Sequence, residues 1–224
     1  MSVTYKQTLS INSYNDVKDR LRVRIMDYEP NKKKFEDLIY GRVSGGFALV
    51  PYMILDEISD GAVANITNGM AQAMCVDRFT IIKNAMAESE KRNPPVLRRL
   101  ADMLSGKLTR NLLSDGMKHN IEPNELLVLT IDDGILGASA LYYPDTMEKI
   151  SKVIGGDYYV LPSSVHEVLI LPATSHITEQ ELLSMVWSVN STVVSREDEL
   201  ASRVLMYDAG AHQLVIVADD GWGY

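Results

Sequence analysis

The segment from Asn124 to Pro172 constrains the fold most, because apolar runs of strand length alternate there with turn sequences. Asp132-Asp133-Gly134 separates the first two runs and is typical of a β-hairpin turn. Pro144 opens an amphipathic stretch that ends at Gly155-Gly156, as a helix would. We therefore expect a hairpin of strands 126–131 and 135–142, a helix, and a second hairpin of strands 158–161 and 165–171. Strands joined by such short connections pair antiparallel.

The same rhythm extends to both sides of this segment. We expect strands at 17–26, 47–55 and 62–74, and a last hairpin at 204–207 and 213–217. Helices are expected at 35–40, at 78–91 after the N-cap residue Asp77, at 94–104 after the N-cap residue Asn93, and after Thr178, which forms a capping box with Glu181. The predicted fold class is α+β, with antiparallel hairpins alternating with helices in ββα units.

Polar and glycine-containing sequence divides the chain into five parts. We expect a mobile N-terminus at 1–13, an N-terminal α+β half at 14–106, an exposed loop or linker at 107–123, a C-terminal half of two ββα units and a hairpin at 124–218, and an acidic tail at 219–224. The length of 224 residues allows one large domain or two small ones.

Three features of the N-terminal half carry alternatives. In residues 17–26, apolar residues alternate with Arg20, Arg22 and Arg24, which favours a strand, although the apolar spacing also fits a helix. The arginine row is typical of the solvated side of an edge strand, with an anion contact as the alternative. Pro51 predicts that the strand at 47–55 is bulged or lies at an edge, and residues 62–74 are ambiguous between strand and helix.

Cys75 is the only cysteine, so it cannot form an internal disulfide, and we expect it to be a small buried side chain. A lone thiol fits a reducing compartment. The first residues contain no apolar run like that of a secretory signal, and no run elsewhere has the length of a membrane-spanning helix. These features predict a cytoplasmic protein without membrane contact.

Charge is distributed unevenly along the chain. Residues 1–112 hold 17 basic and 13 acidic side chains, a balance of +4, whereas residues 113–224 hold 5 and 17, a balance of −12. The acidic half disfavours direct nucleic-acid binding, because phosphates repel carboxylates. It is either an ordinary solvated surface or a face for a basic protein partner. The acidic clusters that would form this face are Asp132, Asp133, Glu197, Asp198, Glu199, Asp219 and Asp220.

Ser163, Ser164, His166 and Glu167 form a polar cluster within the most apolar segment. On a strand, Ser164 and His166 would point to the same face, as a nucleophile and its base require. The sequence has no Gly-x-Ser-x-Gly elbow, so the alternative is a hairpin turn whose hydroxyls bond turn amides. The histidines lack the close spacing of zinc ligands, and we expect no metal and no cofactor.

Two segments resemble an uncharacterised bacterial family, domain of unknown function 5688. They are the run GILGASALYYP at 134–144 and the run LPSSVHE at 161–167, which is similar to the family signature L-P-S-S-x-H-E. Members of that family occur in anaerobic Gram-positive bacteria and their mobile elements. The resemblance spans most of the chain and is weakest at 62–76 and 105–124. It implies a fold and no activity, and it identifies Ser163, Ser164, His166 and Glu167 as signature residues.

The sequence thus predicts a cytoplasmic protein that acts by binding and not by catalysis, with a protein partner. In one form of this hypothesis, it is an inhibitor carried by a mobile element, and its acidic half occupies the nucleic-acid groove of a basic enzyme. The alternatives are a small hydrolase that uses Ser164 and His166, and a structural adaptor.

Overall fold

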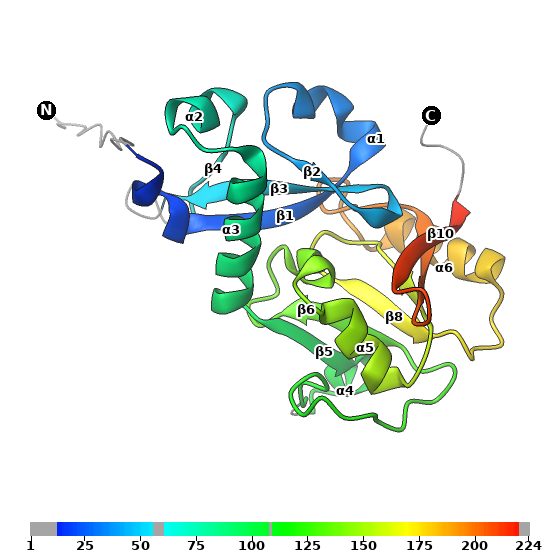
Figure 1. Ribbon diagram of the computed structural model, residues 1–224. Coiled ribbons are helices and arrows are strands. Elements are labelled where there is room, and N and C mark those ends of the chain that lie inside the picture. Colours follow the sequence, from blue (N-terminus) through cyan, green and yellow to red (C-terminus); the bar gives the residue numbers. More distant parts are fainter. Residues whose placement is uncertain (1–12, 56–60, 108, 220–224) are drawn as a thin grey trace, which may run out of the picture.

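The computed structural model describes residues 13–55, 61–107 and 109–219, and two antiparallel sheets organise it (Figure 1). The predicted mobile N-terminus up to residue 12 and the tail from Asp220 lie outside the described residues. The first sheet contains β1 (Leu21–Asp27), β2 (Gly41–Arg42), β3 (Phe47–Ile54) and β4 (Val63–Asn65). The second has the strand order β10-β9-β7-β8-β6-β5. Its strands are β5 (Pro95–Arg99), β6 (Leu127–Ile131), β7 (Tyr158–Leu161), β8 (Val168–Pro172), β9 (Arg203–Asp208) and β10 (Gln213–Asp219).

Helices connect and cover these strands. The α-helices are α1 (Tyr28–Asn31), α2 (Asn68–Ala73), α3 (Arg78–Arg92), α4 (Leu100–Leu104), α5 (Thr146–Ile154) and α6 (Glu179–Thr192). The 3-10 helices are η1 (Tyr14–Asp16), η2 (Lys18–Arg20), η3 (Lys32–Glu36), η4 (Ser44–Gly46) and η5 (Gly137–Tyr142). Helices and antiparallel sheets together confirm the α+β fold class. Within the described ranges, none of the helices has the length and apolar character needed to span a bilayer.

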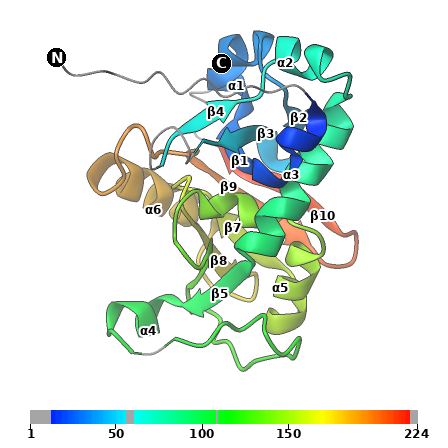
Figure 2. The same ribbon diagram turned by 90° about the vertical axis from the view of Figure 1, so that its left-hand side faces the viewer.

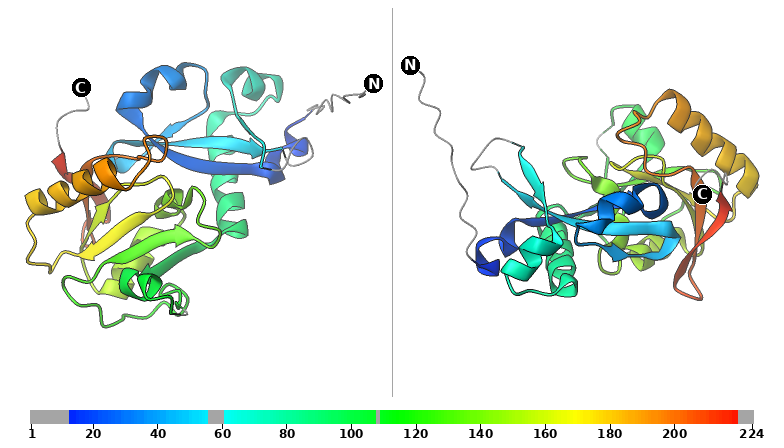
Figure 3. Two further views of the ribbon diagram at one scale, coloured as in Figure 1. Left: turned by 180° about the vertical axis from the view of Figure 1, so that it is seen from behind. Right: turned by 90° about the horizontal axis from the view of Figure 1, so that it is seen from above.

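The six-stranded sheet lies between two helices. Ile150 and Val153 of α5 are buried in the larger core on one face, and Leu182 and Val186 of α6 pack in a separate core on the other. Figure 1 shows α5 in front of this sheet, and the reverse view in Figure 3 shows α6 in front. The strands are therefore apolar on both faces, which accounts for the continuous apolar runs of the segment 124–172.

Helix α3 packs against the four-stranded sheet and runs from it toward β5 (Figure 2). Asp77 caps the helix as predicted, since its Oδ1 accepts the backbone N–H groups of Phe79 and Thr80 at 2.9 and 3.0 Å. Ile81 and Ala85 are buried in the core beneath the sheet. Near the C-terminal end of α3, the Ser89 hydroxyl accepts the backbone N–H of Val23 in the edge strand β1 at 2.9 Å.

This helix changes the role of the arginine row. Arg22 lies on an edge strand as predicted, but it is buried, with an exposed fraction of 7 %. Arg24 is partly buried and donates from Nη2 to Asn65 Oδ1 at 2.8 Å. The prediction of a solvated arginine face is therefore wrong, because α3 and the segment around Tyr143 cover the edge of β1 that a row of free charges would protect.

A buried ion pair joins the two sheets. Asp27, the last residue of β1, pairs with Arg203, the first residue of β9. Arg203 also donates to the carbonyl oxygen of Gly45 at 3.0 Å, and its guanidinium lies over the Phe47 ring, 5.2 Å from the centroid. Three groups from the four-stranded sheet and the turn before β3 therefore surround one guanidinium of the six-stranded sheet.

Several predicted elements are confirmed: the strands near 17–26, 47–55 and 126–131, the helix after Asp77, the capping box of Thr178 and Glu181, and the hairpins β7–β8 and β9–β10. The prediction that Pro51 makes its strand bulged or places it at an edge is wrong. Pro51 interrupts neither its own strand nor the register with β1, and β3 has β1 on one side and β2 and β4 on the other. Pro51 lies in β3 where the neighbour on one side changes from β2 to β4, so its missing N–H falls in a gap between partners.

Other local predictions are wrong. The predicted helix at 94–104 is β5 followed by the short α4, because residues 95–99 pair with β6. The predicted strand at 135–142 is η5, and the predicted strand at 62–74 is β4 followed by α2, whose N-cap is Thr67. The helical turn predicted at 35–40 comes earlier, at η3, and Cys75 is exposed.

Candidate functional site

The hairpin signature LPSSVHE is centred on the contacts of His166. Its Nδ1 accepts the backbone N–H of Leu136 at 3.2 Å, and its Nε2 lies 3.1 Å from Asp198 Oδ1. Because Nδ1 is an acceptor, the proton is on Nε2 and points at the carboxylate. Both ring nitrogens of His166 are thus occupied by partners other than Ser164.

Ser164 shares this turn but acts as an acceptor. Its hydroxyl oxygen accepts the backbone N–H of His166 at 3.0 Å, as in a serine turn. Ser163 is buried, and its carbonyl oxygen accepts the N–H of Leu200 at 3.0 Å. Glu167 is partly buried next to them. This geometry favours the turn interpretation, and the hydrolase alternative stays a prediction.

Asp198 completes the cluster from a separate loop. Hydrogen bonds from the Ser195 hydroxyl and from His166 lower the pKa of the Asp198 carboxyl. The loop is tied to the hairpin by the backbone N–H of Val165, which donates to the Asp198 carbonyl oxygen at 2.8 Å. The signature hairpin therefore has fixed partners on two sides, the loop at Asp198 and the segment at Leu136.

The two signature segments meet where His166 holds Leu136. Leu136 adopts the left-handed conformation, with φ 57° and ψ 27°, which costs free energy for a side chain of this size. At Gly137, a Cβ atom would lie 2.6 Å from the His166 carbonyl oxygen and 2.4 Å from Thr130 Oγ1, so only glycine fits. The hairpin thus fixes the path of residues 134–144, the other signature segment.

The predicted acidic residues are divided between two places. Glu197, Glu199 and Asp219 line a cavity of about 640 Å³ at the junction of the sheets, together with Arg196 and Arg203. Asp132 pairs with Arg98 at 3.3 Å, and Asp133 lines a different, smaller cavity at the edge of β1. The cavity at the junction contains both signs of charge. The acidic-face hypothesis stays a prediction.

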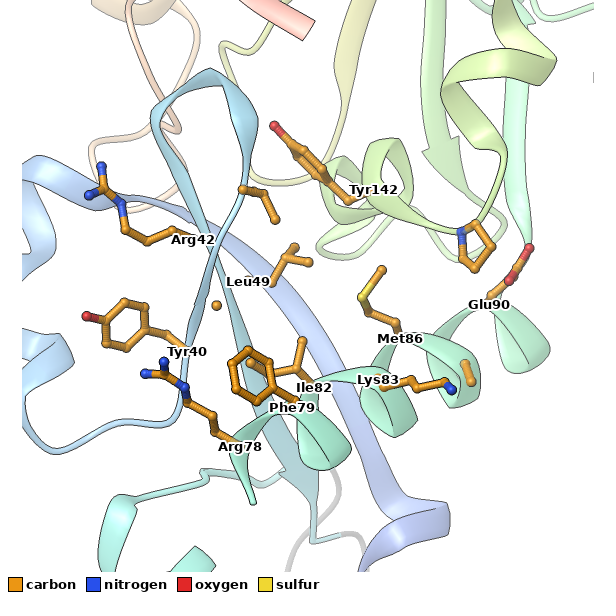
Figure 4. A pocket seen from close by; sticks show the side chains of 14 residues that line it. Tyr40, Arg42, Leu49, Arg78, Phe79, Ile82, Lys83, Met86, Glu90 and Tyr142 are labelled. Carbon is orange, nitrogen blue, oxygen red and sulfur yellow. The ribbon is translucent and has the colours of Figure 1, made fainter. Parts of the chain in front are cut away.

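A groove of about 840 Å³ lies between α3 and the hairpin of β2 and β3 (Figure 4). Its floor is apolar and includes Leu49, Ile82 and Met86, with the ring of Tyr142 at one end. Phe79 stands at its mouth and is 70 % exposed. A volume in this range and a mostly apolar lining are typical of ligand pockets.

The polar groups of the groove lie at its rim and are mostly cationic. They are Arg42, Arg78, Lys83 and Glu90. The Arg42 guanidinium lies over the ring of Tyr28 and that of Arg78 over the ring of Phe79, at 4.2 and 4.9 Å from the centroids. The Tyr142 hydroxyl donates to the Ser44 carbonyl oxygen at 2.7 Å, and burial raises its pKa, so it is a neutral anchor.

Local sequence patterns do not predict this groove, because its lining comes from three segments far apart in the chain. One local clue was available: Phe79 lies two residues after the cap Asp77 and is off the apolar stripe of the helix. Within the described residues, no three His, Cys, Asp or Glu side chains gather as metal ligands would.

Comparison with known proteins gives a family and no activity. A family model described as "Family of unknown function (DUF5688)" matches residues 2–209. No curated protein and no solved structure matches the chain. The match contains both signature segments and every residue that lines the groove.

Proposed function

This chain belongs to DUF5688, a family of unknown function, and we propose that it is a non-catalytic binding protein whose ligand occupies the groove beside α3. The observation that carries this proposal is an apolar floor beneath a basic rim. An exposed aromatic side chain such as Phe79 loses its contact with water when a ligand covers it, which stabilises the complex.

The ligand class follows from the rim. The rim has three cations, Arg42, Arg78 and Lys83, and one carboxylate, Glu90. The groove therefore suits a molecule with an apolar body and an anionic head, and we assign it to a medium- or long-chain carboxylic acid. The ligand proposed here is anionic, whereas the partner predicted from the acidic half is basic.

A titration series tests the charge preference directly. Decanoate, decanol and decyltrimethylammonium share one apolar chain and differ in head-group charge, so calorimetry with each, below its micelle concentration, isolates the contribution of the rim. We expect decanoate to bind most tightly and the cation least. Equal affinities for the anion and the cation would contradict the proposal.

Variants locate the site. Arg78→Ala should weaken decanoate binding by about three- to tenfold and leave decanol unchanged. Lys91→Ala is the matched control, because Lys91 lies on the same helix, is exposed and does not line the groove. Phe79→Ser should weaken all three ligands, whereas Trp187→Ser, at a similarly exposed aromatic on α6, should weaken none. A decanoate affinity that Phe79→Ser leaves unchanged would place the ligand elsewhere.

A further inference from the structure

A second, smaller cavity of about 130 Å³ lies at the edge of β1. Its walls come from β1 and β3, from the C-terminal end of α3, and from the end of β6 with the segment that follows it to Tyr143. It shares no lining residue with the groove beside α3. The volume accommodates a small ion and excludes a nucleotide or a sugar.

Arg22 is the one cation among the described residues that line this cavity. Its side chain is buried, and its Nη1 donates to the carbonyl oxygens of Leu21 and Asp19 at 2.6 and 3.3 Å. Among the described residues, no carboxylate forms an ion pair with it; Glu88 acts only at longer range, and Arg92 opposes that effect. Burial lowers the pKa of the guanidinium, as expected for a cation without a counter-ion.

Apart from the Asp133 carboxylate, the remaining polar side chains of the described wall are hydroxyls and an amide. Tyr52 faces Arg22 across the β1–β3 pairing. Burial raises the pKa of the Tyr143 hydroxyl, and the neighbouring hydroxyls of Ser139 and Ser89 oppose the rise. Ser89 also accepts the Val23 N–H, which leaves its own proton for donation. Of these groups, the hydroxyls of Tyr52, Tyr143 and Ser89 can donate to an anion, whereas the Ser139 hydroxyl already donates to the Leu136 carbonyl oxygen at 3.0 Å.

One carboxylate, Asp133, lies in the described wall but does not neutralise Arg22. Its Oδ2 accepts from the Asn93 amide at 2.8 Å, and its Oδ1 accepts the Ile135 N–H at 3.0 Å. Each oxygen therefore has a donor of its own, Asn93 from the end of α3 and Ile135 from the same loop. Leu136, in its left-handed conformation, forms the adjoining wall.

We propose that this cavity binds a small tetrahedral oxyanion, inorganic phosphate or sulfate, with Arg22 as counter-ion and the hydroxyls of Tyr52 and Tyr143 as donors. A guanidinium presents several N–H donors in a plane, which matches oxyanion geometry. The signature hairpin supports this site indirectly, because His166 holds Leu136 in the wall.

The test is calorimetric titration of the full chain with sodium phosphate and sodium sulfate, with ionic strength held constant by sodium chloride. We expect saturable binding of both anions and a phosphate-dependent rise in Tm. Arg22→Met should weaken binding more than tenfold, because it removes the charge and keeps a long apolar side chain. Arg24→Met is the matched control. Arg24 lies in the same strand, donates a hydrogen bond to Asn65 and does not line the cavity. The phosphate affinity of Arg24→Met should therefore equal that of the wild type.

A second variant keeps the test informative if Arg22→Met does not fold. Tyr52→Phe retains the ring and removes one hydroxyl donor, so phosphate binding should weaken severalfold with the fold intact. No saturable phosphate binding by the wild type, or equal losses in Arg22→Met and Arg24→Met, would overturn the proposal. Arg22→Met should still bind decanoate as the wild type does, so failure here is distinguishable from failure at the groove.

Discussion

Two arginines of this chain are buried to the same degree and have different surroundings. Arg203 at the junction of the sheets is 8 % exposed and has a carboxylate partner in Asp27. Arg22 at the edge of β1 is 7 % exposed, and it donates to backbone carbonyl oxygens. One guanidinium is therefore neutralised by the fold, and the other retains its charge in a cavity lined with hydroxyls.

The difference separates a structural charge from a site for a ligand. A buried ion pair offsets the desolvation of both its members only while both are present. A buried cation without a partner costs folding free energy that an anion from solution can recover. Arg203 should thus matter for stability under all conditions, whereas Arg22 should matter chiefly for anion binding.

The largest expected effect comes from breaking the pair at the junction. Arg203→Met leaves the Asp27 carboxylate buried without its counter-ion, and we expect a loss of about 3–5 kcal/mol in the free energy of unfolding. Arg22→Met removes a cation that has no carboxylate partner among the described residues and should change stability by about 1 kcal/mol or less in phosphate-free buffer. Urea denaturation of both variants and the wild type measures these free energies of unfolding. Equal losses in the two variants would contradict the distinction between the two arginines.

The stability of Arg203→Met should also depend on pH. Burial raises the pKa of Asp27 above its usual value, while Arg203 opposes the rise, so Arg203→Met should raise it further. A raised folded-state pKa means that stability is fully present below the unfolded-state pKa and is lost as pH rises through the folded-state pKa. The deficit of Arg203→Met should therefore shrink toward pH values near 3.8, the usual value for an aspartate. The double variant Asp27→Leu/Arg203→Met should recover most of the loss at neutral pH.

An intermediate effect is expected where the signature segments meet. Gly137→Ala places a Cβ atom against the backbone of His166 and Ile131 and should destabilise by about 1–3 kcal/mol, because backbone must move. It should also weaken phosphate binding, since Leu136 in the cavity wall is the adjacent residue. Gly156→Ala is the control, because a Cβ atom there meets nothing within 4 Å. A stable Gly137→Ala protein with unchanged phosphate affinity would show that the signature hairpin does not support the cavity.

Local chemistry made part of this fold predictable. Asp77 and the pair Thr178–Glu181 specify helix starts through hydrogen bonds within three residues, and both are confirmed. The hairpins β7–β8 and β9–β10 follow from apolar runs flanking turns. Sequence resemblance identified the family, and the family match confirms it.

The failures lie where distant contacts override local preference. Leu97, Leu100 and Leu104 have helical spacing, but pairing with β6 places Leu97 in a strand opposite Leu129. Arg22 has the pattern of a solvated row, yet α3, which begins more than fifty residues later, covers it. Leu136 departs from a strand because His166 binds its N–H group. Both cavities are lined by segments that are far apart in the chain, so local sequence patterns do not predict them.

The smallest expected effect lies at Asp198, on the outer side of His166. Hydrogen bonds lower the pKa of this carboxyl, so its stabilising contribution is present above its usual pKa of 3.8 and is lost as pH falls through the lower folded-state value. Asp198→Asn should flatten the acidic limb of stability against pH, measured by urea denaturation at steps between about pH 3 and pH 6. The change should be small because the side chain is 43 % exposed. Glu197→Gln on the adjacent residue is the control. An Asp198→Asn profile that coincides with that of the wild type would show that His166 holds Leu136 without help from this carboxylate.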